Sequence, residues 1–141
     1  MRTICIDTWG WINIFNRKEP HHHDVIQIYQ NVRNTRGIIF TTDYILDEVY
    51  TLLFKRVPFD VAQKAVEVIS HAIEDGYLNF IWVTPERFEA AQALRIKFRD
   101  KPDISFTDLT SMVVMQELKI CEIVTGDAHF THVGMGFSLL P

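Results

Sequence analysis

The sequence has few cysteines, no long apolar run and no excess of positive charge. No apolar stretch approaches the roughly 20 residues that a membrane-spanning helix requires, and no charged-then-apolar leader opens the chain. We therefore expect a cytoplasmic protein without a disulfide framework, in which Cys5 and Cys121 are buried free thiols. The net charge of −4 argues against a protein that is basic throughout, such as a nonspecific DNA coat, but leaves room for a local basic patch.

No internal repeat, low-complexity tract or linker divides the chain. We expect one domain over residues 1–141, with a substantial core because 48% of its residues are hydrophobic. Expected strands cover residues 3–7, 38–42, 78–83, 122–125 and 137–140. Expected helices cover residues 9–15, 24–35, 44–55, 58–74, 86–98 and 108–119, the second with Asp24 as its N-cap. This alternation predicts an α/β fold, a three-layer α/β/α sandwich around a mainly parallel sheet.

Four acidic residues occupy positions close to strand ends or helix starts. Asp7 ends the first expected strand, and Asp127 in "TGD" follows the fourth. Asp108 opens a helix that is apolar nearly all round, and Glu48 lies at the edge of the apolar stripe of the helix 44–55. Because ligands of parallel sheets bind beyond the carboxyl ends of the strands, we expect these acids on one rim.

Each acid also has an ordinary structural interpretation. Asp7 suits an N-cap, Glu48 a boundary residue whose stem packs, and Asp127 a turn. Ser105 and Asp108 have the spacing of a capping box. Taken together, however, acids that converge would repel one another unless a cation neutralises them. A hard divalent ion such as Mg²⁺ or Mn²⁺ suits oxygen ligands and supports phosphoryl displacement.

Four segments in chain order resemble the four blocks of the PIN-domain family: "ICIDT", "TTDYILDEVYTLL", "SFTDLTSMVVMQELKI" and "IVTGDAHF". From Thr3 to about Phe137 the chain is similar to stand-alone members of the VapC toxin type. The resemblance implies a three-layer α/β/α fold and an endoribonuclease that depends on Mg²⁺ or Mn²⁺. It further implies an RNA substrate, an antitoxin partner that inhibits the enzyme, and a homodimer.

The same resemblance implies which residues form the site. The acidic positions are Asp7, Glu48, Asp108 and Asp127. In the family these acids hold one or two metal ions, which activate the water that attacks the phosphodiester. The supporting hydroxyl positions are Thr8, Ser105 and Thr125. Two positions depart from the family pattern. Trp9 stands where relatives have a small residue, and Gly126 stands where a larger residue is common, so access to Asp7 is open to question.

Further residues carry a functional and an ordinary interpretation of similar weight. The cluster "RIKFRDK" supplies Arg95, Arg99 and Lys101, which either contact RNA phosphates or form a solvated helix end. Trp9 either stacks on an unpaired base or packs in the core. His129 lies close to the expected site and is a candidate for phosphate contact or proton transfer.

Other functions stay open at this level. A PIN-like protein that binds RNA or serves as a scaffold without catalysis is the main alternative, although all four acids are present. A phosphatase or receiver domain would need a second Asp after the first strand, and "DTW" lacks it. The histidine run at residues 21–23 is best explained as part of a solvated loop, because adjacent imidazoles converge poorly on one ion.

Overall fold

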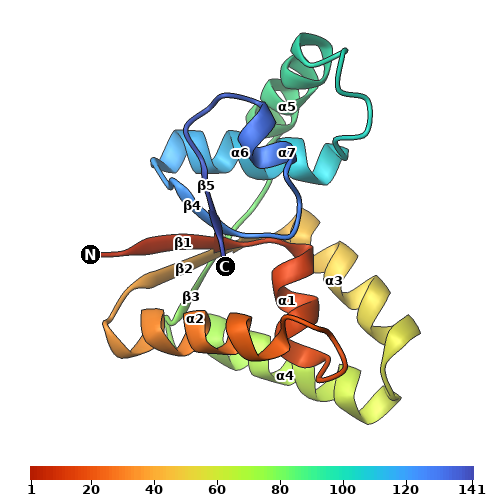
Figure 1. Ribbon diagram of the computed structural model, residues 1–141, viewed down its shortest axis with the longest axis vertical. Helices are drawn as coiled ribbons and strands as arrows, with labels where there is room; N and C mark the ends of the chain where they lie inside the picture. The colour runs from red at the N-terminus through yellow and green to blue at the C-terminus, as the bar shows by residue number, and fades with distance from the viewer.

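A five-stranded sheet lies between two layers of helices in the computed structural model, which describes residues 1–141 (Figure 1). The strands are β1 (Thr3–Ile6), β2 (Ile38–Thr42), β3 (Leu78–Ile81), β4 (Glu122–Val124) and β5 (Ser138–Leu140). Their order is β3-β2-β1-β4-β5, and every neighbouring pair is parallel. The expected α/β fold, a three-layer α/β/α sandwich around a parallel sheet, is confirmed.

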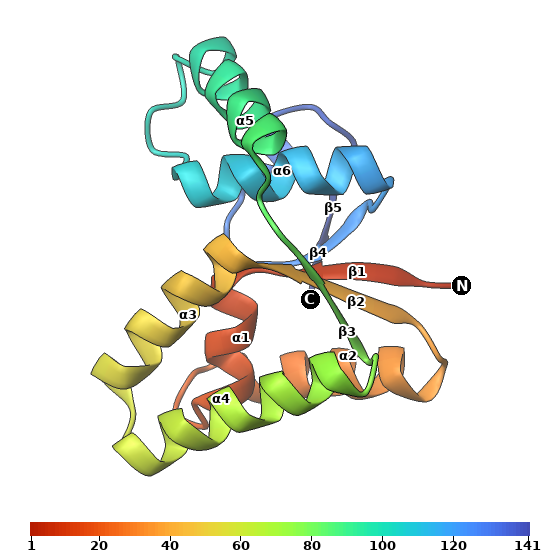
Figure 2. The ribbon, with the colours of Figure 1, turned by 180° about the vertical axis from the view of Figure 1, so that it is seen from behind.

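Seven helices form the two outer layers. They are α1 (Thr8–Phe15), α2 (His22–Asn34), α3 (Asp43–Arg56), α4 (Phe59–Glu74), α5 (Pro85–Lys97), α6 (Phe106–Leu118) and α7 (His129–His132). Helices α1 to α4 lie on one side of the sheet, and α5, α6 and α7 lie on the other (Figures 1 and 2). None of the helices combines the length and apolar character that a membrane crossing requires.

The central strand β1 is the part of the sheet that matters most for function. It pairs with β2 on one side and β4 on the other, and Ile4, Cys5 and Ile6 are almost completely buried. Strands β2 and β3 follow β1 on one side, and β4 and β5 lie on the other side, so the strand order reverses direction between β1 and β4. Parallel α/β sheets bind ligands in the crevice at the carboxyl ends of such strands.

Polar side chains start the helices that leave this end of the sheet. Asp7 caps α1, because its Oδ1 accepts a hydrogen bond of 3.0 Å from the Gly10 backbone N–H. Ser105 caps α6 in the same way, with its hydroxyl oxygen 3.0 Å from the Asp108 backbone nitrogen. Such caps satisfy backbone donors that have no partner within the helix. The capping interpretations of Asp7 and Ser105 are therefore confirmed.

Some expected details are wrong. Helix α2 begins at His22 rather than after an Asp24 cap, and Asp24 lies in its first turn. Helix α6 begins at Phe106, two residues before the expected start at Asp108, directly after its N-cap Ser105. The short helix α7 was not expected at all. Cys121 is exposed, since it precedes β4 in the connection from α6, whereas Cys5 is buried as expected.

Candidate metal centre

One cleft at the carboxyl end of β1 and β4 contains all four predicted acids. Its volume is about 510 Å³. Its lining includes Asp7, Glu48, Asp108 and Asp127, together with Thr8, Trp9, Ser105, Gly126 and Arg56. The acids come from a strand end, the middle of α3, the first turn of α6 and the loop after β4. The parallel topology thus brings together side chains that are up to 120 positions apart, from residue 7 to residue 127.

Asp7 is the most deeply placed of the four acids, with 5% of its surface exposed. Its backbone N–H donates a hydrogen bond of 3.2 Å to the Val124 carbonyl, which ties the end of β1 to β4. The pKa of Asp7 is raised to about 7, chiefly by burial, and the nearby carboxylates of Asp108 and Asp127 contribute to this increase. Hydrogen bonds from the Thr125 hydroxyl and the Gly10 N–H act in the opposite direction.

Asp108, on the other side of the cleft, also has a raised pKa. Burial raises its pKa to about 7, and repulsion from Asp127 and Glu48 contributes to the increase. His129 opposes this increase by favouring the ionised carboxylate. Two carboxyl groups with pKa values near 7 in one cleft are poorly stabilised as free anions. A bound cation would remove much of that cost.

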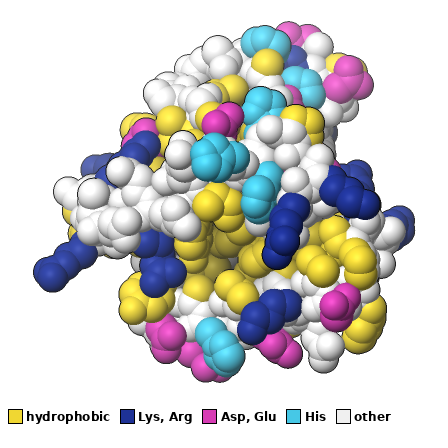
Figure 3. All heavy atoms as spheres, turned by 60° about the horizontal axis from the view of Figure 1, so that its bottom comes forward, with side chains coloured by type: hydrophobic (Ala, Val, Ile, Leu, Met, Phe, Trp, Pro, Cys, Tyr) yellow, Lys and Arg dark blue, Asp and Glu magenta, His cyan; other side chains and the backbone are white.

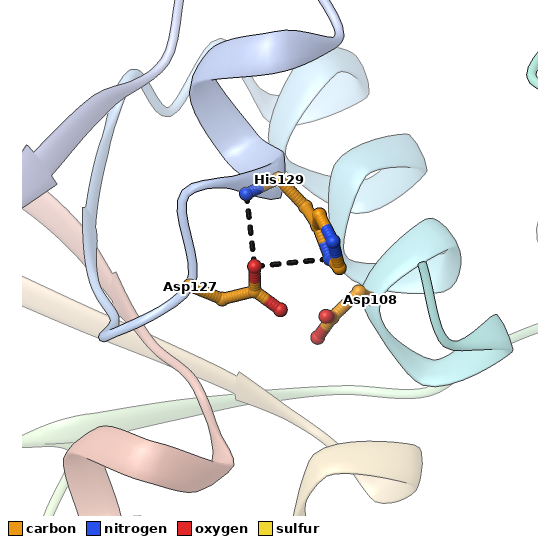
Figure 4. Close-up of side chains that lie close together, drawn as sticks. All are labelled: Asp108, Asp127 and His129. Atoms are coloured by element: carbon orange, nitrogen blue, oxygen red, sulfur yellow. Dashed lines mark hydrogen bonds and ion pairs between the residues drawn. The ribbon is translucent and has the colours of Figure 1, made fainter. Parts of the chain in front are cut away.

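Asp127 is held by contacts within its own loop. The Thr125 hydroxyl oxygen accepts a 3.0 Å hydrogen bond from the Asp127 backbone N–H. Oδ1 of Asp127 accepts a 2.9 Å hydrogen bond from the His129 backbone N–H and lies 2.9 Å from Nδ1 of the His129 ring. The second carboxylate oxygen faces Asp108 (Figure 4). One ligand atom each from Asp108, Asp127 and His129 lies within 4.8 Å of the others, close enough to share an ion.

The donor set fits a divalent cation. Carboxylate oxygens are the ligands that Mg²⁺ and Mn²⁺ prefer, and at least Asp7 and Asp108 are destabilised as anions without one. Glu48 is half-buried and enters the cleft from α3. Its position beside Leu52 at the edge of the buried stripe agrees with the helical spacing in the sequence. We therefore treat these acids as the candidate metal ligands.

Among the cleft residues that sequence reasoning missed, Arg56 and Asn13 carry the clearest chemistry. Arg56 lies eight residues after Glu48, so both lie on one face of α3 and Arg56 brings a positive charge into the cleft. Asn13 lies four residues after Trp9, and its Nδ2 donates a 2.9 Å hydrogen bond to the Trp9 carbonyl. Oδ1 of Asn13 is buried without a partner. The helical spacing was the available signal for both residues.

The two departures from the family pattern are in direct contact. A methyl group added at Gly126 would lie 2.6 Å from Nε1 of Trp9 and 2.7 Å from its Cε2. Only glycine therefore lets the indole lie against this backbone. The other neighbour of the indole is His21, with ring centroids 5.3 Å apart. Trp9 is thus a wall of the cleft beside Asp7, and Gly126 provides the space for it.

The basic cluster lies outside the cleft lining. Arg95 donates hydrogen bonds to three backbone carbonyl groups in the segment 98–104, so its guanidinium organises the loop before α6. Nζ of Lys101 forms an ion pair of 2.9 Å with its neighbour Asp100. Arg99 is exposed at the end of the same helical segment. Of these three residues, Arg99 alone forms no side-chain hydrogen bond or ion pair within the protein.

Comparisons with known proteins agree with this geometry. The PIN domain profile matches residues 4–135. A VapC ribonuclease from Archaeoglobus fulgidus is 32% identical over 129 residues, which are 89% of this chain and 78% of that protein.

Two solved structures share the fold. The chain superposes with a TM-score of 0.76 on Mycobacterium tuberculosis VapC20, a sarcin–ricin loop cleaving toxin, at 24% identity over 93% of this chain and 95% of the other. It superposes with a TM-score of 0.75 on VapBC2 from Rickettsia felis, bound to a DNA fragment from its promoter, at 13% identity over 99% of each chain. The chain belongs to the PIN domain family.

Proposed function

We propose that this protein is a metal-dependent endoribonuclease that hydrolyses RNA phosphodiester bonds as the toxin of a toxin–antitoxin pair. The observation that carries the proposal is the convergence of four acids in one cleft, where burial and mutual repulsion raise the pKa values of Asp7 and Asp108 to about 7. The identity to a VapC ribonuclease supports the same reaction and substrate. A cytoplasmic location is proposed with it, because RNA is the substrate.

The metal ligands in this proposal are Asp7, Asp108 and Asp127, with Glu48 completing the acidic ring. A bound Mg²⁺ or Mn²⁺ lowers the pKa of its water and stabilises the charge that develops on phosphodiester oxygens. The chain itself keeps the ligands in place. Ser105 fixes the first turn of α6, and Thr125 holds both Asp7 and Asp127.

Other cleft residues would bind the substrate. Arg56 supplies a positive charge within the acidic cleft and suits a phosphate group next to the scissile one. Trp9 forms one wall of the cleft and Thr8 lines it beside Asp7. Arg95 and Lys101 are occupied by protein partners, so among the predicted basic contacts Arg99 is the one we retain for RNA.

The test compares cleavage of labelled RNA in Mg²⁺, in Mn²⁺ and in EDTA by the full chain. The Asp108→Asn variant should lose cleavage by several orders of magnitude, because the ligand charge is removed. Asp47→Asn, on the exposed face of α3, serves as the matched control and should retain full activity. Undiminished metal-dependent cleavage by Asp108→Asn would overturn the proposal. RNA retention without cleavage in any metal would instead favour the non-catalytic RNA-binding alternative.

An antitoxin partner is part of the proposal. Solved structures of the same fold include DNA-bound VapBC2 from Rickettsia felis and DNA-bound VapBC from Salmonella typhimurium. On this chain, hydrophobic side chains gather in a hollow on the face formed by α2 and α4, with Lys and Arg side chains around it (Figure 3). On the same side of the sheet, a hollow between the end of α1 and the start of α4 is lined by Phe15, Val61 and Ala65, with Lys18 and Lys64 beside them. Charge and shape suit an amphipathic segment that carries acidic residues.

The partner surface is tested by inhibition. An antitoxin that is co-expressed with the chain should suppress RNA cleavage and co-purify with it. Val61→Asp should weaken both effects, because it places a charge on the apolar lining, whereas Leu118→Asp, a residue of equal exposure at the end of α6, should leave them unchanged. Equal inhibition of the two variants would exclude this hollow as the antitoxin surface.

A homodimer is proposed as well. Trp82, Phe88 and Ile96, in α5 and the segment before it, are exposed by 64%, 37% and 71%, and exposed hydrophobic side chains favour association. Light scattering on the purified chain should give twice the mass of 16.5 kDa. Ile96→Asp should shift the mass towards the monomer, and a monomeric wild-type protein would contradict the proposal.

A further inference from the structure

His129 has a nitrogen atom with no aligned hydrogen-bond partner at the centre of the site. Its Nδ1 is buried, although 28% of the side chain is exposed as a whole. The atom lies 2.9 Å from Oδ1 of Asp127, yet the two atoms do not form an aligned hydrogen bond. A buried polar atom without such a partner is costly, and in native proteins it usually indicates a role. His129 belongs to a group in which one ligand atom each from His129, Asp108 and Asp127 lies within 4.8 Å of the others.

The position of the ring is fixed by the backbone. The His129 N–H donates to Oδ1 of Asp127, which places residue 129 at the start of α7 directly beside that carboxylate. The ring of His132 packs against it edge-on, with centroids 6.4 Å apart. Nδ1 therefore faces the two acids, as Figure 4 shows. An RNA phosphate outside the cleft would have to use the other ring nitrogen.

We propose that Nδ1 of His129 is a ligand of the same metal ion as Asp108 and Asp127, and that this nitrogen makes the site prefer Mn²⁺ to Mg²⁺. The proposal rests on the metal-dependent function proposed above and assigns an additional ligand to it. Mg²⁺ binds oxygen donors in a strict octahedron and retains its waters. Imidazole nitrogen is a common ligand of transition-metal ions, whereas Mg²⁺ is held almost entirely by oxygen donors. A ring nitrogen beside two carboxylates therefore favours the transition-metal ion.

Metal binding without RNA provides the test. The full chain is titrated with Mn²⁺ and with Mg²⁺ by calorimetry, and its Mn²⁺ complex is studied by electron spin echo spectroscopy, which detects a coordinated ¹⁴N nucleus. We expect tighter binding of Mn²⁺ than of Mg²⁺ and a clear ¹⁴N signal. His129→Asn should lose the signal and bind Mn²⁺ at least roughly tenfold more weakly, since loss of even an outer-shell partner has that effect. Its affinity for Mg²⁺ should change little.

His23→Asn is the matched control, because His23 is an exposed histidine of α2 and is absent from the acidic cluster. This variant should keep the ¹⁴N signal and both affinities. A signal that persists in His129→Asn, or equal losses for Mn²⁺ and Mg²⁺, would overturn the assignment and leave His129 as a residue that only positions Asp127. RNA cleavage with Mg²⁺ or Mn²⁺ but without any ¹⁴N signal would refute this inference alone. A wild-type chain that binds neither ion would refute the proposed function as well.

Discussion

Replacement of Asp7 by Asn should stabilise the metal-free protein while it abolishes function. The pKa of Asp7 is raised from 3.8 to about 7 in the folded state, chiefly by burial. Each unit by which the pKa changes on folding corresponds to about 1.4 kcal/mol. Ionised Asp7 therefore lowers the free energy of unfolding by up to about 4 kcal/mol at pH 8. Asn retains a side-chain oxygen that accepts the Gly10 N–H, and Asn and Asp are equivalent as N-caps. The substitution therefore removes the charge without removing the cap.

The sign of the pH dependence follows from the direction of the pKa change. Because folded Asp7 binds its proton more tightly than unfolded Asp7, the wild type is most stable below pH 4 with respect to this group. Its stability falls as the pH rises from about 4 to about 7, and the full cost is present above pH 7. Asp7→Asn should consequently show little gain at pH 4 and its largest gain at pH 8.

Chemical denaturation in EDTA at pH 4 and pH 8 measures this difference directly. Asp47→Asn, an exposed substitution on α3, is the control and should change stability by less than about 0.5 kcal/mol at either pH. Added Mn²⁺ should stabilise the wild type, by about 2.7 kcal/mol at 100 times its dissociation constant, and should have a much smaller effect on Asp7→Asn. A variant that is less stable than the wild type at pH 8 in EDTA would refute the electrostatic reasoning.

Three further predictions concern the same cleft. The affinity for Mn²⁺ should fall as the pH drops below about 7, because protons compete with the ion for Asp7 and Asp108. Calorimetry across pH 5–8 measures this affinity, and an affinity that does not change with pH would contradict the prediction. Gly126→Ala should destabilise the protein by about 1–3 kcal/mol through its clash with Trp9, and Trp9→Ala in the same chain should restore most of the loss in thermal unfolding. Arg56→Gln should raise KM for RNA and reduce the salt dependence of binding, with unchanged kcat, and an unaltered salt slope would contradict phosphate contact.

The sequence was sufficient for the architecture and for the location of the acids. Buried strands alternating with helices predicted a parallel sheet, and the strand ends predicted that Asp7 and Asp127 share its carboxyl rim. These inferences succeeded because side-chain periodicity and strand direction are local properties with direct spatial consequences. The capping and cleft-lining interpretations of Asp7 are also compatible, since one carboxylate accepts the Gly10 N–H and lines the cleft.

Other properties depend on contacts between distant segments, and the sequence does not display them. Arg95 looked equivalent to Arg99, yet Arg95 binds carbonyl groups of the following loop while Arg99 is exposed. Trp9 and Gly126 looked like two separate departures, although each explains the other once β4 lies beside β1. Cys121 sits in an apolar run, but the strand begins one residue later and leaves the thiol exposed.

The central position of β1 has a consequence for how the protein is made. The strand that leads to Asp7 is synthesised long before its partner β4 and the last of the four acids, Asp127. Glu48 and Asp127 are separated by 127 − 48 = 79 residues, which a ribosome adds in roughly 4–16 s. Throughout that interval the growing chain lacks at least one of the proposed metal ligands. A nuclease built in this way cannot attack RNA near its own ribosome until the segment that follows β4 has been translated.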